Sequence, residues 1–569
     1  MKSLFANLSK RQSVASGAIT IALFSIVSKL LGLVRHTLIA SQFGTGPIAE
    51  SFFAAFRIPD FLFNALVLGA LSTAFIPVFL DLFTNKKLSD ATVPEDLSTD
   101  SSEESLVSVN IDYSKWKLFK KLTQFTASSK YTPHFDLTNA FLNLLLILLT
   151  VSAGILWIIT PALTEKLVPG FDAERLSLTI SFTRIMLISP ILFGVSNVMS
   201  SSLQAFKRFT AFALAPVLYN AGIIFGIVVL YPLIGAIGLA WGVVTGALFH
   251  LLAQLPGMTQ LGFRWRPVFP WQVAGAKRVL RLILPRALAL SANQINQMVN
   301  TMLASTLVAG SVVVFYNAYD IEVLPVSLFA VSIGVSSFPV LGELYLQKKR
   351  NEFREVLTVI TSRVLLIMLP LTVFMILLRA QIVRLILGYG LYDWNATRRT
   401  LTVFGILCVS LIAQGLIPIF ARAFYAKEET KTPVIIGVLA IVLNIIVAVS
   451  IIKHAALLGL AIAFSVSSIL HCAALAIMLE HRLKGFLTKT LLKNFLIYTL
   501  AALIAGFALY ITLYLVDALT GTTRVWALLT QAAVAFIVGG AVYSVLLFVA
   551  GEETVEGIIA RIRKRLVKQ

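Results

Sequence analysis

The sequence predicts an all-α polytopic membrane protein of about fourteen transmembrane helices, in two pseudo-symmetric six-helix lobes followed by two C-terminal helices. Three observations lead to this fold class: an apolar composition, recurring apolar stretches and a weak internal repeat. Of the 569 residues, 58% are hydrophobic and 13% are charged, whereas a soluble domain carries about 25% charged residues. The mean hydropathy is +0.88. This composition excludes a soluble enzyme, a disordered scaffold and a secreted disulfide-rich domain.

Apolar stretches long enough to cross a bilayer recur along the whole chain. A spanning helix needs roughly 20 mostly apolar residues. The least regular of these stretches is the second, which contains several charged residues. The stretches lie at 15–40, 47–83, 137–163, 176–205, 209–231, 233–256, 279–309, 313–345, 357–380, 399–424, 433–452, 456–479, 491–515 and 525–550.

Loop charges orient these spans. The chain has 47 Lys and Arg residues against 27 Asp and Glu, a formal charge of +20. In a soluble protein that excess would suggest nucleic acid, but in a membrane protein it marks cytoplasmic loops that face anionic lipid. We therefore expect no nucleic-acid partner. With the N-terminus in the cytoplasm, most basic residues fall in cytoplasmic connections, so both termini are expected to be cytoplasmic.

A weak internal repeat divides the chain. Residues 238–240 (GLA) recur 221 positions later as residues 459–461, and His250 recurs as His471 at the same offset. The matching copies have the same orientation in the membrane, which predicts two parallel lobes related by an axis along the membrane normal. Such duplications are typical of secondary transporters, which bind their substrate between the lobes.

The repeat gives a domain plan with six parts. The N-lobe contains a long polar loop at 84–134. The acidic, Ser-rich part of that loop is expected to be disordered or a solvated spacer, and its basic, aromatic end can form an interfacial helix. The parts are a cytoplasmic N-terminus (1–14), an N-lobe (15–257), a cytoplasmic linker (258–278), a C-lobe (279–480), two further helices (481–550) and a basic cytoplasmic tail (551–569).

Charged side chains inside the predicted spans are candidate functional residues. An ionisable side chain in a span costs on the order of 2.5–3.5 kcal/mol, so it normally faces a cavity or a partner. Lys29 and Arg35 on the first span, with Arg286 on the seventh, suit an anion such as phosphate or pyrophosphate. The acidic members can instead be internal counter-ions. The other candidates in this group are Glu50, Arg57, Asp320 and Glu322.

A polar stripe on the seventh span adds candidates of another kind. Asn293, Asn296, Gln297 and Asn300 follow the spacing i, i+3, i+4 and i+7, which aligns four amides on one helix face. If this face lines a wet cavity, the amides can hydrogen-bond a sugar or a peptide.

Motifs for built-in chemistry are absent from the sequence. It contains no phosphate-binding loop of the Walker type, no Cys/His cluster for a metal, and no hydrolase signature in a plausible setting. We therefore expect neither an enzyme nor a cofactor or bound metal. Transport would be driven by an ion gradient, the membrane potential or the substrate gradient, and a monovalent coupling cation is left open.

Several segments resemble one known family. These are residues 24–35 (FSIVSKLLGLVR), 50–59 (ESFFAAFRIP) and 69–77 (GALSTAFIP), with later matches at 325–339, 423–425 and 431–434. Their order and spacing resemble the MurJ/MviN family of lipid II flippases, which belongs to the multidrug/oligosaccharidyl-lipid/polysaccharide exporter superfamily. The resemblance covers roughly residues 15–480.

The resemblance implies a function as well as a fold. It implies alternating access that carries an undecaprenyl-pyrophosphate-linked disaccharide-peptide to the outer leaflet of the bacterial cytoplasmic (inner) membrane, for peptidoglycan and cell-wall biogenesis and cell shape. The two last helices would form a groove for the polyprenyl tail. Implied partners are this lipid-linked pyrophosphate, membrane lipids and cell-wall synthesis proteins. The family's basic cavity positions on the first helix map onto Lys29 and Arg35, and an acidic position maps onto Glu50.

The chain departs from the family pattern at several of its charged positions. Where the family usually has paired arginines and then a glutamate, this chain has Phe63, Asn64 and Leu68. Where the family has Asp-Arg and a later Glu on the eighth helix, it has Tyr319, Asp320 and Val323. Arg57 or Arg286 is expected to compensate for the lost cations, or the head group differs. The family's sodium site pairs an Asn with an Asp one turn later, whereas Asn444 is followed there by Ala448, which argues against sodium coupling.

Other functions remain open at this point. One is a cation-coupled multidrug exporter of the same superfamily, which would need a small acidic cavity and no C-terminal pair of helices. Another is a flippase for a different lipid-linked oligosaccharide. A third is a membrane scaffold that transports nothing, for which Lys29 and Arg35 would be dispensable.

Overall fold

The predicted all-α membrane fold is confirmed in the part of the chain that the structure describes. A computed structural model describes residues 14–68, 133–273, 293–521 and 524–552, with Phe75, Phe79 and Ala276 as isolated positions. These residues form helices joined by turns and short loops, and they contain no strand. Ten described helices are long and apolar enough to cross a membrane, or eleven if the bent pair α19–α20 is one span. The exact total of fourteen stays a prediction.

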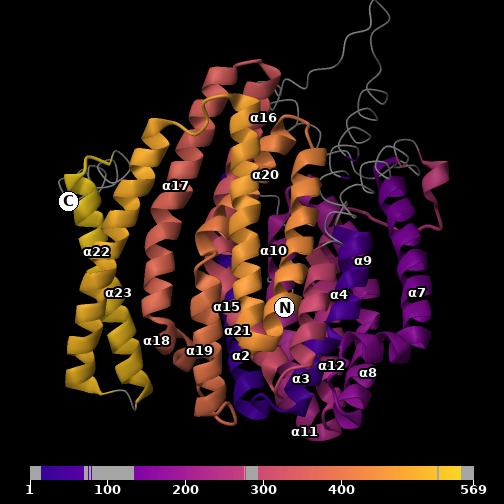
Figure 1. The fold of residues 1–569 in the computed structure, drawn as a ribbon. Helices are drawn as coiled ribbons and strands as arrows, with labels where there is room; N and C mark the ends of the chain where they lie inside the picture. Colours follow the sequence, from indigo (N-terminus) through magenta and orange to yellow (C-terminus); the bar gives the residue numbers. More distant parts are fainter. Residues whose placement is uncertain are drawn as a thin grey trace, which may run out of the picture.

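The helices of the N-terminal half, drawn in indigo to magenta, lie mainly on one side of the bundle (Figure 1). Helix α2 packs against α10, and α10 packs against α12. The α-helices described in the N-terminal half are α2 (Val14–Phe43), α3 (Pro47–Ala55), α4 (Arg57–Phe63), α7 (Pro133–Leu167), α8 (Ala173–Met186), α9 (Ile188–Ala205), α10 (Phe209–Phe225), α11 (Tyr231–Ile234), α12 (Ile237–Leu252) and α13 (Leu255–Gln260).

The second half begins with a helical stretch at 293–305, and it is followed by a pair of helices at the C-terminus. The π-helical turn Val326–Ala330 separates α15 from α16, and both form one long apolar span. The helices of the second half are α15 (Ser311–Pro325), α16 (Val331–Leu346), α17 (Arg350–Leu377), α18 (Arg379–Leu387), α19 (Trp394–Cys408), α20 (Leu411–Ala426) and α21 (Lys431–Leu483). The C-terminal pair consists of α22 (Lys489–Thr520) and α23 (Val525–Val549).

The sequence repeat is visible in the backbone as a broken helix that occurs in each half. The pair α8–α9 and the pair α19–α20 begin 221 positions apart and end 221 positions apart. An aspartate caps each pair by accepting a backbone N–H three residues on. The Arg175 backbone N–H donates to Asp172 Oδ1 at 2.9 Å, and the Ala396 backbone N–H donates to Asp393 Oδ1 at 2.7 Å. Because the caps recur at the offset of the sequence repeat and the breaks recur within two residues of it, they support a duplicated architecture.

Helix α21 contains a chain reversal. Its 53 residues would extend for about 80 Å if they formed a straight helix, far more than the roughly 30 Å hydrocarbon core. Ala456 interrupts it with φ 48° and ψ −127°. A methyl group built on Gly459 would lie 3.3 Å from the carbonyl carbon of Ile451, although eight residues of straight helix span about 12 Å. The segment therefore folds back, which fits the separate stretches predicted at 433–452 and 456–479.

The two C-terminal helices stand at one side of the bundle, outside the repeat (Figure 1). Helices α22 and α23 pack on each other, and α22 also packs on α17. The Tyr543 hydroxyl donates to the Leu366 carbonyl at 2.9 Å, and the rings of Phe374 and Phe536 lie 5.7 Å apart. These contacts fix the pair to the second half of the chain.

The lobe boundaries and the orientation of the termini stay predictions. Most of the loop 84–134, nearly all of the tail 551–569, the start of the chain before Val14 and the end of the linker 258–278 lie outside the described residues.

The reversal at Ala456 gives a stability prediction. Gly235, 221 residues earlier, makes the corresponding turn with φ 70° and ψ −157°. An L side chain with a positive φ costs roughly 1–2 kcal/mol. Ala456→Gly should therefore stabilise the protein by about this amount and Gly235→Ala should destabilise it, as measured by thermal unfolding in detergent. The matched control is Ala455→Gly, in ordinary helix, which should cost about 0.5–1 kcal/mol. Equal effects of the two alanine-to-glycine changes would contradict the proposed turn.

Candidate functional site

A cavity of about 250 Å³ lies where the two halves of the chain meet. Helices α2, α3, α4 and α10 from the first half and α15 from the second contribute its walls. Its lining combines four charged side chains with a histidine and several aromatic rings. The lining residues are Arg35, His36, Ile39, Phe52, Phe53, Phe56, Arg57, Asp60, Tyr219, Tyr316, Tyr319 and Asp320.

Arg35 is held in the cavity by an amide and an imidazole. Its Nη1 donates to Asn220 Oδ1 at 3.2 Å, and its Nη2 lies 3.2 Å from His36 Nε2. His36 connects the two halves, because its Nδ1 lies 3.3 Å from Asn317 Oδ1 and its Nε2 lies 3.5 Å from Asp320 Oδ2. Arg35 itself makes no ion pair with a carboxylate among the described residues.

Arg57 is held by an aromatic ring. Its guanidinium carbon lies 4.0 Å from the ring centroid of Tyr316, and its Nε donates to the Phe53 carbonyl at 3.3 Å. Asp60 lies one turn later on α4 and lines the same cavity. Within the described chain Arg57 also lacks a carboxylate ion pair. Both arginines are thus fixed by neutral groups and keep their charge available to an entering anion.

Lys29 is the third cation on this side of the interface. It lies on α2 six residues before Arg35 and donates a hydrogen bond to the hydroxyl of Ser327. Ser327 belongs to the π-helical turn Val326–Ala330, and such turns are frequent at functional sites. A second π-helical turn, Asn64–Leu68, follows α4 in the first half. Each turn directly follows a helix that contributes side chains to the cavity.

Glu50, predicted as a cavity residue, is placed elsewhere. Its side chain is only 2% exposed and accepts from Arg175 Nη1 at 2.7 Å. Its other oxygen faces the backbone N–H of Val312 at 3.4 Å. Arg175 also pairs with Asp172 at 3.0 Å, and hydrogen bonds from the Arg175 backbone and side chain lower the pKa of Asp172. Glu50 therefore joins α3 to α8 and to α15.

The predicted amide stripe is mostly an interhelical contact. Asn296 and Asn300 are buried, and Asn444 Nδ2 donates to their side-chain oxygens at 2.7 and 3.4 Å. Gln297 is buried, and its backbone carbonyl accepts from the Tyr316 hydroxyl at 2.7 Å. Asn293 is exposed. None of the four lines the cavity described above.

Two further predicted residues complete the inventory. Glu322 is fully buried and accepts from Gln414 Nε2 at 2.8 Å, away from the cavity lining. Arg286 lies outside the described residues. Of the predicted set, the structure thus brings Arg35, Arg57 and Asp320 into one cavity and places Lys29 on the same helix as Arg35.

The prediction left out the aromatic part of the site. Tyr219, Tyr316 and Tyr319 line the cavity together with His36 and Asp60. For Asp60, the i, i+3 spacing from Arg57 was an available signal. The tyrosines carry no such signal, because aromatic residues in apolar helices more often pack against neighbouring helices.

A family model described as "Lipid II flippase MurJ" matches residues 39–99 and 123–550 of this chain. The chain belongs to the MurJ family. A lipid II flippase MurJ from Burkholderia cenocepacia is 29% identical over 476 residues, which cover 82% of this chain and 83% of that protein. A probable lipid II flippase MurJ from Buchnera aphidicola is 28% identical over 454 residues, with 79% and 80% covered.

Solved structures share the fold of this MurJ family member. A lipid II flippase MurJ in an inward closed conformation superposes with a TM-score of 0.71 at 21% identity, over 92% of this chain and 98% of that one. A multidrug resistance MATE family transporter in an inward-facing conformation superposes with a TM-score of 0.62 at 17% identity, over 82% of this chain and 98% of that one. At these identities the likeness concerns the fold alone, and the MurJ structure is the more similar of the two.

The buried Glu50–Arg175 pair gives a stability prediction. Removing one partner of a buried pair typically costs about 3–5 kcal/mol, because the other charge stays buried without compensation. Arg175→Ala should therefore lower the thermal unfolding midpoint strongly, and Glu50→Gln/Arg175→Gln should recover part of the loss. Lys166→Ala, an exposed cation at the end of α7, is the control and should have little effect. Equal midpoints for Arg175→Ala and Lys166→Ala would contradict a stabilising pair.

Proposed function

We propose that this chain moves lipid II, the polyprenyl-pyrophosphate-linked peptidoglycan precursor, from the cytoplasmic to the outer leaflet of the bacterial inner membrane. The observation that carries this proposal is the pair Arg35 and Arg57, which line one cavity between the halves and are held there by Asn220 and Tyr316 rather than by carboxylates. A guanidinium that is oriented without an ion pair to a carboxylate is suited to a pyrophosphate. Membership of the MurJ family supports this substrate.

Alternating access is supported by where the two halves touch. Hydrogen bonds between the halves in the described residues run from Lys29 through His36, Thr37 and Ser41 to Glu50, with one more at Gly170. Most therefore lie toward the end of α2 that leads into α3, opposite the end with the basic connections. The cavity of about 250 Å³ is smaller than the roughly 300–1,000 Å³ of typical ligand sites. Binding a lipid-linked disaccharide-peptide thus requires the halves to separate.

The remaining parts of the proposal follow the domain plan. The two lobes, 15–257 and 279–480, rock against each other around the cavity, and both termini face the cytoplasm. Helices α22 and α23, on the outer side of α17, offer the polyprenyl tail a surface beside the bundle. Cell-wall synthesis proteins act as suppliers and users of the substrate. The protein acts as a transporter rather than as an enzyme.

The coupling ion is a separate question from the substrate. Asn444, the position that resembles part of a sodium site, donates its amide hydrogens to Asn296 and Asn300. Ala448 supplies no carboxylate one turn later. We therefore favour transport driven by the membrane potential or by the substrate gradient over coupling to sodium.

A multidrug exporter is the second candidate function. It is favoured by the fold likeness to a MATE transporter and by two carboxylates, Asp60 and Asp320, in the cavity lining. The same lining contains two arginines, so the cavity is not the acidic one that would select organic cations. The flippase therefore remains the better supported function.

A genetic replacement tests the flippase. In a bacterial host depleted of its own lipid II flippase, the wild-type chain should restore growth and Arg35→Ala should not, at equal membrane levels. Loss of a charge-assisted contact of about 1.5–3 kcal/mol should slow flipping at least about tenfold.

The matched control for this test is Arg184→Ala. Arg184 lies on α8, and its guanidinium carbon lies 4.5 Å from the ring centroid of Trp157. It does not line the cavity. This variant should rescue growth. Rescue by Arg35→Ala would remove Arg35 from the substrate path. Failure of the inserted wild-type chain would point to another lipid-linked head group.

A further inference from the structure

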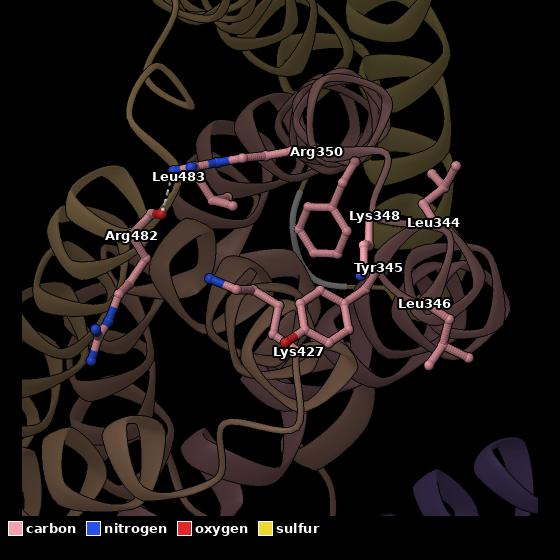
Figure 2. A pocket seen from close by; sticks show the side chains of 9 residues that line it. Leu344, Tyr345, Leu346, Lys348, Arg350, Lys427, Arg482 and Leu483 are labelled. Atoms are coloured by element: carbon pink, nitrogen blue, oxygen red, sulfur yellow. Dashed lines mark hydrogen bonds between the residues drawn. The ribbon is translucent and has the colours of Figure 1, made fainter. Parts of the chain in front are cut away.

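A second pocket, of about 510 Å³, lies at the end of the bundle that contains the basic connections (Figure 2). It is formed where α16 ends, α17 begins, and α20 and α21 end. Four of its nine lining residues are cationic, and none is acidic within the described part of the chain. The lining residues are Leu344, Tyr345, Leu346, Lys348, Arg350, Phe353, Lys427, Arg482 and Leu483.

The four cations of this basic pocket differ in whether they form an ion pair or a hydrogen bond. Arg482 pairs with Glu429 at 3.1 Å, and Arg350 donates to the Arg482 carbonyl at 2.9 Å (Figure 2). Lys348 and Lys427 form no ion pair among the described residues. Burial lowers the pKa of Lys427, Glu429 opposes that shift, and Arg482 and Arg350 add to it. Lys348 and Lys427 thus lie in a lining whose described residues include four cations and no carboxylate.

Lys348 follows the end of helix α16 in a left-handed backbone conformation. Its φ is 58°, a conformation that favours glycine. Its backbone N–H donates to the Tyr345 carbonyl at 2.9 Å, and that of Lys349 donates to the Leu344 carbonyl at 3.0 Å. These bonds close the end of α16 and would also form with glycine at position 348. The amino group of Lys348 can therefore be removed without loss of the turn.

The pocket lining also contains apolar side chains. Leu344, Leu346 and Phe353 line it beside the lysines, and Leu346 is 75% exposed. Cations next to apolar side chains at the end of a membrane-spanning bundle match the boundary between phosphate groups and acyl chains. A soluble phosphate would use only the cationic part of this lining.

We propose that the basic pocket binds a phosphate group supplied by the headgroup of an anionic phospholipid. Lys348 and Lys427 contact the phosphate, and Leu346 contacts the glycerol and upper acyl chain. The bound lipid ties the α16–α17 connection to the ends of α20 and α21. This site is separate from the cavity between the halves and does not depend on the transported substrate.

Native mass spectrometry of the purified full chain in detergent tests the site, with dioleoyl phosphatidylglycerol and dioleoyl phosphatidylcholine as probes. We expect the wild-type chain to bind the first phosphatidylglycerol at least about tenfold more tightly than phosphatidylcholine. Lys348→Gly/Lys427→Gln should abolish this preference, because both charge-assisted contacts to the phosphate are lost. Lys348→Gly alone should weaken it and, since glycine suits this backbone, should not destabilise the fold.

Lys484→Gly is the matched control. Lys484 has the same left-handed backbone, with φ 51°, at the same end of the bundle, but it does not line the pocket. This variant should keep the preference within about twofold, since an exposed charge outside the pocket contributes little. A double variant that binds phosphatidylglycerol as tightly as wild type would overturn the proposal. Binding of glycerol phosphate as tight as that of phosphatidylglycerol would overturn the lipid as the source of the phosphate.

Discussion

A charged side chain inside a membrane bundle must either find a partner or face water, and the placement of ionisable residues in this chain follows from that constraint. Glu50 forms an ion pair with Arg175, and one oxygen of Glu322 accepts a hydrogen bond from the amide of Gln414. Both acids are fully or almost fully buried, so they act as fixed links between helices. Arg35 and Arg57 meet the same constraint differently, because they line a cavity. The difference between a dry link and a cavity wall separates the structural charges from the candidate binding charges.

The distribution of helices was predictable because it depends on composition and period. Long apolar stretches and the 221-residue repeat predicted the bundle, and the caps at Asp172 and Asp393 recur at that same offset. The turn inside α21 was harder to place. In the first half Gly235 marks it, whereas in the second half Ala456 adopts a similar positive φ without glycine or proline as a signal. Tertiary packing of the two helical segments, rather than local preference, therefore sets this turn.

The candidate site was predictable only in part, because helical spacing indicates which face a residue shares but not what packs on that face. The spacing of Asn296 and Asn300 correctly placed them on one face, yet Asn444, more than 140 residues further along the chain, covers them. Glu50 meets Arg175, a residue predicted to lie in a loop. Arg35 and Arg57 were identifiable as charges in apolar helices, but the aromatic lining around them carried no comparable signal.

The way in which the two cavity arginines are held bears on what they can bind. A guanidinium paired with a carboxylate must lose that partner before it can accept a phosphate, and the lost interaction opposes binding. Asn220 and Tyr316 orient Arg35 and Arg57 without cancelling their charge. Asp320 is instead close to His36, at 3.5 Å, on the opposite side of the interface between the halves. Neither arginine forms an ion pair with a carboxylate among the described residues, so both can meet an anion when the halves separate.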